Sequence, residues 1–85
     1  MIFHVQLSTQ AKRQLAELQL SLQRRGVDLL GRLGDWPEVS GVKALRGNMA
    51  GSFRARIGDY RVVFRVTDSV LTVVAIAHRK EVYSK

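Results

Sequence analysis

Residues 53–66 read FRARIGDYRVVFRV, in which apolar and arginine side chains alternate on both sides of Gly58-Asp59. Alternation with a period of two is typical of β-strands that bury one face. A two-residue connection made of Gly and Asp is typical of a tight β-hairpin. We therefore expect two antiparallel strands, over residues 53–57 and 60–66.

The two-residue turn also fixes the pairing of these strands, because it sets Ile57 opposite Tyr60. Counting away from the turn places Arg56 opposite Arg61, and like charges in such a position destabilise a sheet. One face carries apolar and aromatic side chains, and we expect the core there. The other face, expected to be exposed, carries four arginines, namely Arg54, Arg56, Arg61 and Arg65.

A third strand is predicted over residues 70–77, after a turn at Asp68-Ser69. Counting across this turn assigns alternate residues to the core face, namely Leu71, Val73, Ala75 and Ala77. It assigns the intervening residues to the arginine face, namely Thr72, Val74, Ile76 and His78. Val63 falls on that face too, so the arginines would lie above an apolar floor with a histidine at one end.

The chain before residue 52 changes from alternation to helical spacing. Residues 2–7 alternate and predict a strand, whereas leucines spaced along one helical face predict helices over residues 9–18 and 21–34. One helix that breaks at Arg25-Gly26 fits the same spacing. Residues 38–51 contain three glycines and are predicted to form a loop.

The predicted element order, β-α-α-β-β-β, is typical of a small α+β domain. In such a domain an αα-hairpin packs on one face of a largely antiparallel sheet. A chain of 85 residues suits a single domain that spans residues 1–85. The apolar content of 46% favours a folded core over disorder.

Composition excludes several kinds of chemistry. The chain has no cysteine, so a disulfide, a thiolate metal site and a cysteine nucleophile are all excluded. Its two histidines, His4 and His78, are far apart in the sequence, and we expect no metal site and no cofactor. No apolar run reaches the ~20 residues of a membrane span, so we expect a cytoplasmic protein with no membrane partner.

The net charge of +7 predicts attraction to a polyanion. Residues 43–85 hold nine basic and three acidic residues, so the excess charge belongs to this half of the chain. Arginine side chains bind phosphate oxygens through two parallel hydrogen bonds, and such binding would relieve the repulsion between opposed arginines. The alternative is a solvated face that is merely basic.

A phosphate-binding face without metal ligands suits one reaction in particular, the attack of an RNA 2′-hydroxyl on its own phosphate. Arginines would stabilise the phosphate charge, but they transfer protons poorly. The candidate proton carriers are His78 and Tyr83. Each has a structural alternative, since His78 could end a strand and hydrogen-bond a carbonyl, and Tyr83 could pack or stack on a base.

Three segments together resemble the RelE/ParE family of toxins from toxin–antitoxin systems. They are LRG at residues 45–47, FRARIGDYRVVF at residues 53–64 and HRKEVY at residues 78–83. The resemblance covers nearly the whole chain and implies a compact β-α-α-β-β-β toxin. RelE-like members cut mRNA in the ribosomal A site without a metal, and an acidic antitoxin that wraps the toxin holds it inactive.

The resemblance also implies roles for individual residues. Arg54 and Arg56 match a basic pair that contacts and activates the substrate. Four positions match catalytic groups, namely Arg61, Arg79, Tyr83 and His78. The two arginines among them would stabilise the phosphate, the tyrosine is catalytic, and some relatives use a histidine near the C-terminus as the acid. Further candidates for binding RNA or phosphate are Arg65, Lys43, Arg46 and Lys80.

The partners that the resemblance implies are a cognate acidic antitoxin, the ribosome and mRNA, with operator DNA reached only through the antitoxin. Two alternatives stay open. A ParE-like protein would inhibit DNA gyrase by binding it and would not be a nuclease. A catalytically inactive remnant would bind only its antitoxin and operator DNA. The complete set of arginines with a C-terminal tyrosine favours a metal-independent endoribonuclease.

Overall fold

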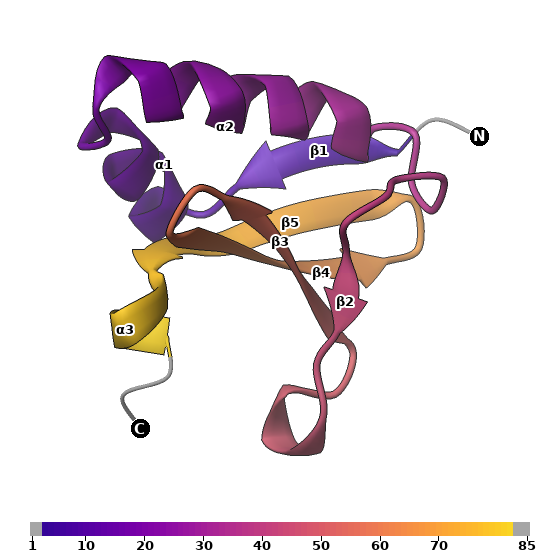
Figure 1. Ribbon diagram of the computed structural model, residues 1–85. Coiled ribbons are helices and arrows are strands. Elements are labelled where there is room, and N and C mark those ends of the chain that lie inside the picture. The colour runs from indigo at the N-terminus through magenta and orange to yellow at the C-terminus, as the bar shows by residue number, and fades with distance from the viewer. Residues whose placement is uncertain (1–2, 83–85) are drawn as a thin grey trace.

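The computed structural model describes residues 3–82, in which two helices cover one face of a five-stranded sheet (Figure 1). The strands are β1 (His4–Leu7), β2 (Lys43–Ala44), β3 (Ser52–Ile57), β4 (Tyr60–Thr67) and β5 (Val70–His78). The helices are α1 (Thr9–Ala16), α2 (Leu20–Leu33) and the short α3 (Arg79–Val82), and η1 (Gly47–Met49) is a 3-10 turn. Among residues 3–82, none of the helices could span a membrane.

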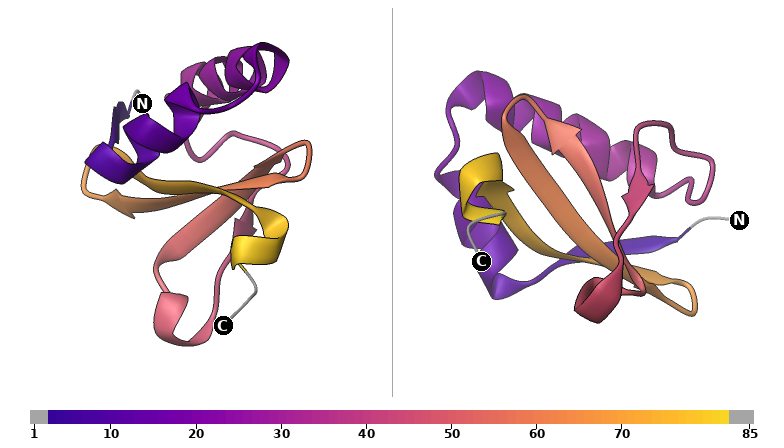
Figure 2. Two further views of the ribbon diagram at one scale, coloured as in Figure 1. Left: turned by 90° about the vertical axis from the view of Figure 1, so that its left-hand side faces the viewer. Right: turned by 60° about the horizontal axis from the view of Figure 1, so that its bottom comes forward.

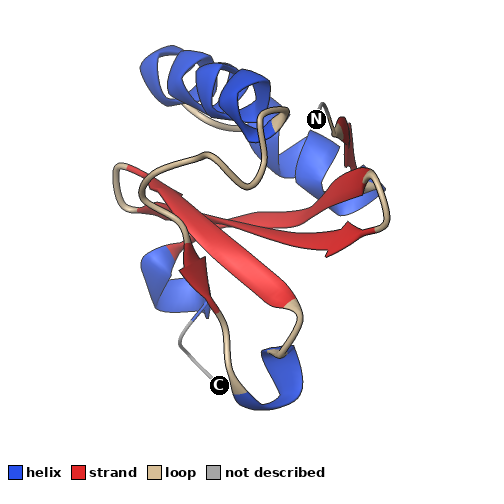
Figure 3. Ribbon diagram, turned by 90° about the vertical axis from the view of Figure 1, so that its right-hand side faces the viewer, coloured by secondary structure: helices blue, strands red, loops and turns tan. Residues whose placement is uncertain are grey.

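The strands follow the order β1-β5-β4-β3-β2 across the sheet. β1 runs parallel to β5, and every other neighbouring pair is antiparallel. α1 and α2 lie on one side of the sheet, whereas α3 and η1 lie on the other side (Figures 1 and 2). Figure 3 shows the same layers from another direction. The predicted α+β fold, an αα-hairpin on one face of a largely antiparallel sheet, is confirmed.

The β3–β4 hairpin has the predicted register, with Ile57 opposite Tyr60 and Arg56 opposite Arg61. Gly58 in the turn has a φ of 60°, a left-handed conformation that glycine adopts without the steric cost of a Cβ atom. The two-residue turn therefore forms as the sequence indicates. It leaves the apolar side chains of both strands, except Val63 opposite Arg54, on the side of α1 and α2.

The core lies between the sheet and these two helices. Its largest fully buried side chains are Phe64, Leu33, Ile57, Leu71, Val62 and Val73. Trp36 covers one end of the core, because its ring centroid lies 4.7 Å from that of Phe53 and 5.3 Å from that of Phe64. Full burial of one such side chain contributes roughly 1.5–3 kcal/mol to folding.

α1 and α2 correspond to the two predicted helices. The Ser8 hydroxyl oxygen caps α1 by accepting a hydrogen bond of 3.0 Å from the N–H of Ala11. Arg25-Gly26 lies inside α2, so the alternative of a single helix broken at that point is wrong. A Cβ atom on the buried Gly26 would lie 3.0 Å from Cδ1 of Leu15, so the glycine lets α2 pack closely against the end of α1.

The sequence predicts a loop over residues 38–51, but this segment also contains a strand and a 3-10 turn. Lys43 and Ala44 form β2 and pair with Arg54 and Phe53 of β3, and η1 follows before the chain enters β3. A strand of two residues is too short to show alternation. Only its pairing with β3 defines it.

A β-bulge in β5 overturns part of the predicted side-chain alternation. Val63 pairs with Ala75 whereas Phe64 pairs with Val73, so Val74 is an extra residue in β5. An extra residue exchanges the two faces of every later position in a strand. The predicted faces are therefore right as far as Val74, which lines a pocket with Arg65 and Thr72, and wrong beyond it.

Beyond the bulge, residues exchange between the core and the arginine face. Ile76, which the sequence places on the arginine face, lies opposite Val62 and is only 2% exposed, within the core. Ala75 and Ala77, which the sequence places in the core, lie on the arginine face. The exchange brings a large apolar side chain into the core and leaves two methyl groups on the opposite face.

The side chains of Ser8, the N-cap of α1, and of Gln14, within α1, satisfy backbone groups around the bulge. The Ser8 hydroxyl donates to the carbonyl oxygen of Val74 at 3.0 Å, and the N–H of Ile76 donates to Oε1 of Gln14 at 2.6 Å. Backbone polar groups that are buried without a partner are costly. The bulge is therefore held by residues 66 and 62 positions away, which strand periodicity does not reveal.

Replacing Gln14 with leucine should destabilise the fold by roughly 1–3 kcal/mol, because the N–H of Ile76 loses its acceptor at a half-buried position. Urea unfolding followed by the fluorescence of Trp36 measures this change. Gln10→Leu is the matched control, because Gln10 is exposed on the same helix. Equal stability of the two variants would show that the Gln14 amide does not hold the bulge.

Candidate functional site

Arg61 lies at the centre of the arginine face, on the side of the sheet away from α1 and α2. It stands opposite Arg56 of β3 and, on its other side, opposite Ala77 of β5. The side chain is only 7% exposed, so the expectation that these arginines are all exposed is wrong for Arg61, and it holds only in part for the half-buried Arg54. A nearly buried guanidinium interacts more strongly with a bound anion than one in open water does.

The charges around Arg61 act on its protonation. Burial lowers the pKa of Arg61 from its ordinary value, and three neighbouring cations lower it further. In order of effect, these cations are Arg56, Arg54 and Arg79. The carboxylate of Asp59 acts in the opposite direction. We call Arg54, Arg56, Arg61 and Arg79 the arginine cluster. The other three members disfavour the charged form of Arg61, and a phosphate bound beside Arg61 would favour that form.

Arg79 joins the cluster through the fold, because it is remote from the β3–β4 hairpin in the sequence. It is the first residue of α3, and its backbone N–H donates to the carbonyl oxygen of Asp59 at 2.8 Å. This bond ties the start of α3 to the hairpin turn. The C-terminal part of the sequence motif and the hairpin part are thus brought together, as the resemblance implies.

The other basic candidates lie around the cluster at different distances. Lys43 stands opposite Arg54 and shares its face at the edge of the sheet. Arg65 lies four residues beyond Arg61 on β4, which corresponds to about 13 Å along a strand. Arg46 is exposed just before η1, and Lys80 is exposed in α3. Tyr83 lies outside the described residues.

His78 does not share a face with the arginines, and the prediction that it does is wrong. The bulge at Val74 turns it to the other face, where it pairs with Tyr60. The two rings meet edge to face, with centroids 5.4 Å apart. His78 also lines a shallow pocket together with Ser21 and Asp59, on the side of α2.

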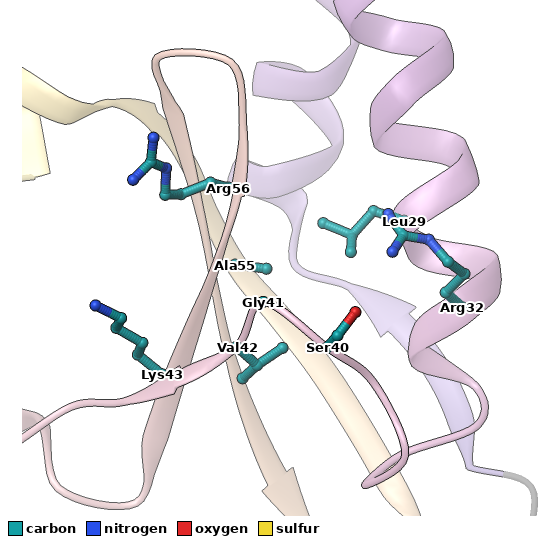
Figure 4. A pocket seen from close by; sticks show the side chains of 8 residues that line it. All are labelled: Leu29, Arg32, Ser40, Gly41, Val42, Lys43, Ala55 and Arg56. Carbon is teal, nitrogen blue, oxygen red and sulfur yellow. The ribbon is translucent and has the colours of Figure 1, made fainter.

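A pocket of about 660 Å³ lies between α2 and the edge of β3 at Ala55 and Arg56, beside the end of β2 (Figure 4). Its apolar lining is formed by Leu29, Val42 and Ala55, and its cationic lining by Arg32, Lys43 and Arg56. Figure 4 shows the side chains of Lys43 and Arg56 pointing to the same side, away from α2. The pocket thus adjoins the arginine face at one edge of the sheet.

Two residues at the site carry no sequence pattern that points to them. Asp59 is indicated only as a turn residue, yet its carboxylate affects Arg61 and its carbonyl holds Arg79. Arg32 lies within the helix predicted over residues 21–34 and pairs with Asp28 at 3.4 Å, yet it lines the pocket beside β2. Within residues 3–82, no three His, Cys, Asp or Glu side chains form a group that could hold a metal ion.

Comparison with known proteins gives one family and several relatives. A family model described as the ParE toxin of the type II toxin–antitoxin system parDE matches residues 5–83. Toxin RelG of Mycobacterium tuberculosis is 35% identical to this chain, and the match covers 100% of both chains.

Solved structures of toxin complexes have the same fold. The toxin–antitoxin complex RelBE2 from Mycobacterium tuberculosis matches with a TM-score of 0.80 and 30% identity, over 93% of this chain and 100% of that chain. The archaeal RelE–RelB complex from Pyrococcus horikoshii OT3 matches with a TM-score of 0.77 and 29% identity, over 93% of this chain and 97% of that chain.

Proposed function

The chain belongs to the RelE/ParE family of toxins from type II toxin–antitoxin systems, and we propose that it is an endoribonuclease that cuts mRNA on the ribosome without a metal. The arginine cluster is the observation that carries this proposal. Three cations surround the nearly buried Arg61, and together they disfavour its charged form. Such an arrangement gains stability when a phosphate occupies it. The proposal places the protein in the cytoplasm, where it would meet ribosomes.

In the proposed reaction, the 2′-oxygen of one nucleotide forms a bond to the adjacent phosphorus while the P–O5′ bond breaks. The 2′-hydroxyl loses its proton to a base, and the leaving 5′-oxygen gains a proton from an acid. The products are a 2′,3′-cyclic phosphate and a 5′-hydroxyl end. In the transition state the phosphate carries additional negative charge, and preorganised arginines stabilise that charge.

The roles of the individual residues follow their positions. Arg61 and Arg79 would stabilise the phosphate, while Arg54 and Arg56 would contact and activate the substrate next to it. Tyr83 follows α3 in the sequence and remains the proposed catalytic tyrosine. The outer cations would bind the flanking RNA, and they are Lys43, Arg46, Arg65 and Lys80.

An acidic antitoxin is the proposed inhibitor. The matched structures RelBE2 and RelE–RelB are complexes of this kind. β2 pairs only with Phe53 and Arg54, so within the described residues no strand covers the β3 edge from Ala55 to Ile57. An extended acidic segment could add to this edge, place apolar side chains in the adjoining pocket and meet the charges of Lys43 and Arg56.

Inhibition of DNA gyrase is the second candidate function, because the matching family model describes a ParE toxin. In that case the basic face would bind a protein and no RNA would be cut. The two candidates predict different damage in the cell. The first breaks mRNA and the second breaks DNA.

The deciding experiment is a short induction of the protein in growing cells. Messenger RNA 5′ ends are mapped, their chemistry is determined, and DNA breaks are measured in parallel. We expect new 5′-hydroxyl ends that repeat with the codon period, together with intact DNA. Intact mRNA together with gyrase-linked DNA breaks would overturn the nuclease and establish the second candidate.

A further inference from the structure

The start of α3 is held in place by two hydrogen bonds. The N–H of Arg79 donates to the carbonyl oxygen of Asp59 at 2.8 Å, and the N–H of Lys80 donates to Nδ1 of His78 at 3.3 Å. His78 directly precedes α3, so its ring occupies the position from which N-cap side chains reach the second helical N–H. The ring is itself supported, because it meets the ring of Tyr60 on the neighbouring strand β4 edge to face.

We propose that His78 is a positioning residue, whose Nδ1 caps α3 and thereby holds Arg79 in the arginine cluster. This inference rests on the proposed nuclease function for its catalytic consequence, but the cap itself does not depend on that function. Arg79 directly follows His78 and is the first residue of α3. A cap at this point therefore holds the turn of helix that carries Arg79.

The same geometry argues against proton transfer by His78. Its pairing with Tyr60 places it on the side of α2, whereas Arg61 faces the other side of the sheet. Its Nδ1 accepts a hydrogen bond, so the neutral ring carries its proton on Nε2. A phosphate held by Arg61 would therefore lie across the sheet from the proton that His78 could donate.

Two substitutions of His78 distinguish the role of its Nδ1 acceptor from the role of its ring. His78→Asn keeps an acceptor near the position of Nδ1 and loses the ring, and asparagine is among the best N-cap residues. His78→Phe keeps a ring against Tyr60 and loses the acceptor. A capping role predicts that asparagine replaces histidine better than phenylalanine does, whereas an acid role predicts that both fail alike.

The test measures two properties of each variant of the full chain. Cα secondary chemical shifts of residues 79–82 report whether α3 is formed, and cleavage of ribosome-bound mRNA reports activity. We expect helical shifts and near wild-type cleavage for His78→Asn. For His78→Phe we expect shifts near those of an unstructured chain and cleavage reduced about fivefold, the typical effect of a lost cap on the equilibrium of a helix end.

Each other outcome has a definite meaning. If α3 is equally helical in both variants, the cap is wrong. If α3 is helical in His78→Asn but its cleavage is abolished, His78 transfers a proton and the positioning role is wrong. The last case is that no form of the protein cleaves mRNA, while the Cα shifts show a helical α3 in His78→Asn and not in His78→Phe. In that case the cap stands and the nuclease function fails.

Discussion

Replacing Arg61 with alanine should reduce RNA cleavage by about 100-fold to 1,000-fold. This is the range observed when one preorganised donor to a developing negative charge is removed. Arg61 should reach this range because it is the nearly buried member of the arginine cluster, with three other arginines acting on its charge. Single-turnover cleavage of mRNA on purified ribosomes measures the effect directly.

Two controls make the Arg61 result specific. Arg24→Ala removes an exposed arginine of α2, on the opposite side of the sheet, and should leave cleavage unchanged. Circular dichroism should show that Arg61→Ala is folded, because the substitution removes repulsion with Arg56 as well as contacts. If Arg61→Ala retains full activity and is folded, the arginine cluster is not the catalytic site.

Replacing Phe64 with alanine should destabilise the fold by about 3–5 kcal/mol, the usual cost of removing a buried phenylalanine ring. Phe64 is fully buried and stacks on Phe53, with ring centroids 5.7 Å apart. A domain of this size has a total stability of only about 5–15 kcal/mol. Urea or thermal unfolding, followed by circular dichroism, measures the loss.

Phe53→Ala is the matched control for the core, because Phe53 has the same ring in the same aromatic cluster but is only partly buried. Its loss of stability should be smaller than that of Phe64→Ala. Equal losses of stability would show that the difference in burial between Phe64 and Phe53 does not determine the size of the effect.

The hairpin and its arginine face could be predicted from residues 53–66. A period of two allows only one division of side chains between two faces, and a turn of two residues permits only one register. Both are local properties of the chain. The structure confirms every pair between Ile57–Tyr60 and Phe53–Phe64. The place of Arg54, Arg56 and Arg61 on one face follows from the same rules.

The start of α3 was predictable only in part. The sequence shows Arg79 next to His78, but nothing local to either residue shows that the Asp59 carbonyl receives the Arg79 N–H. The burial of Arg61 was equally hidden, because an alternating pattern assigns a face to a residue without measuring how much covers that face. Contacts between distant segments determine both properties.

The net charge, the strand period and the hairpin turn are all properties of local residue order, and the arginine face follows from them. The path of β5, where Val74 is extra and Ile76 enters the core, depends instead on contacts between distant segments. That outcome depends on the N-cap Ser8 and on Gln14 of α1, whose side chains hydrogen-bond to β5 backbone groups. A side chain that satisfies a remote backbone group leaves no periodic trace in the strand it supports. For this reason His78 lies across the sheet from the arginines with which the sequence groups it.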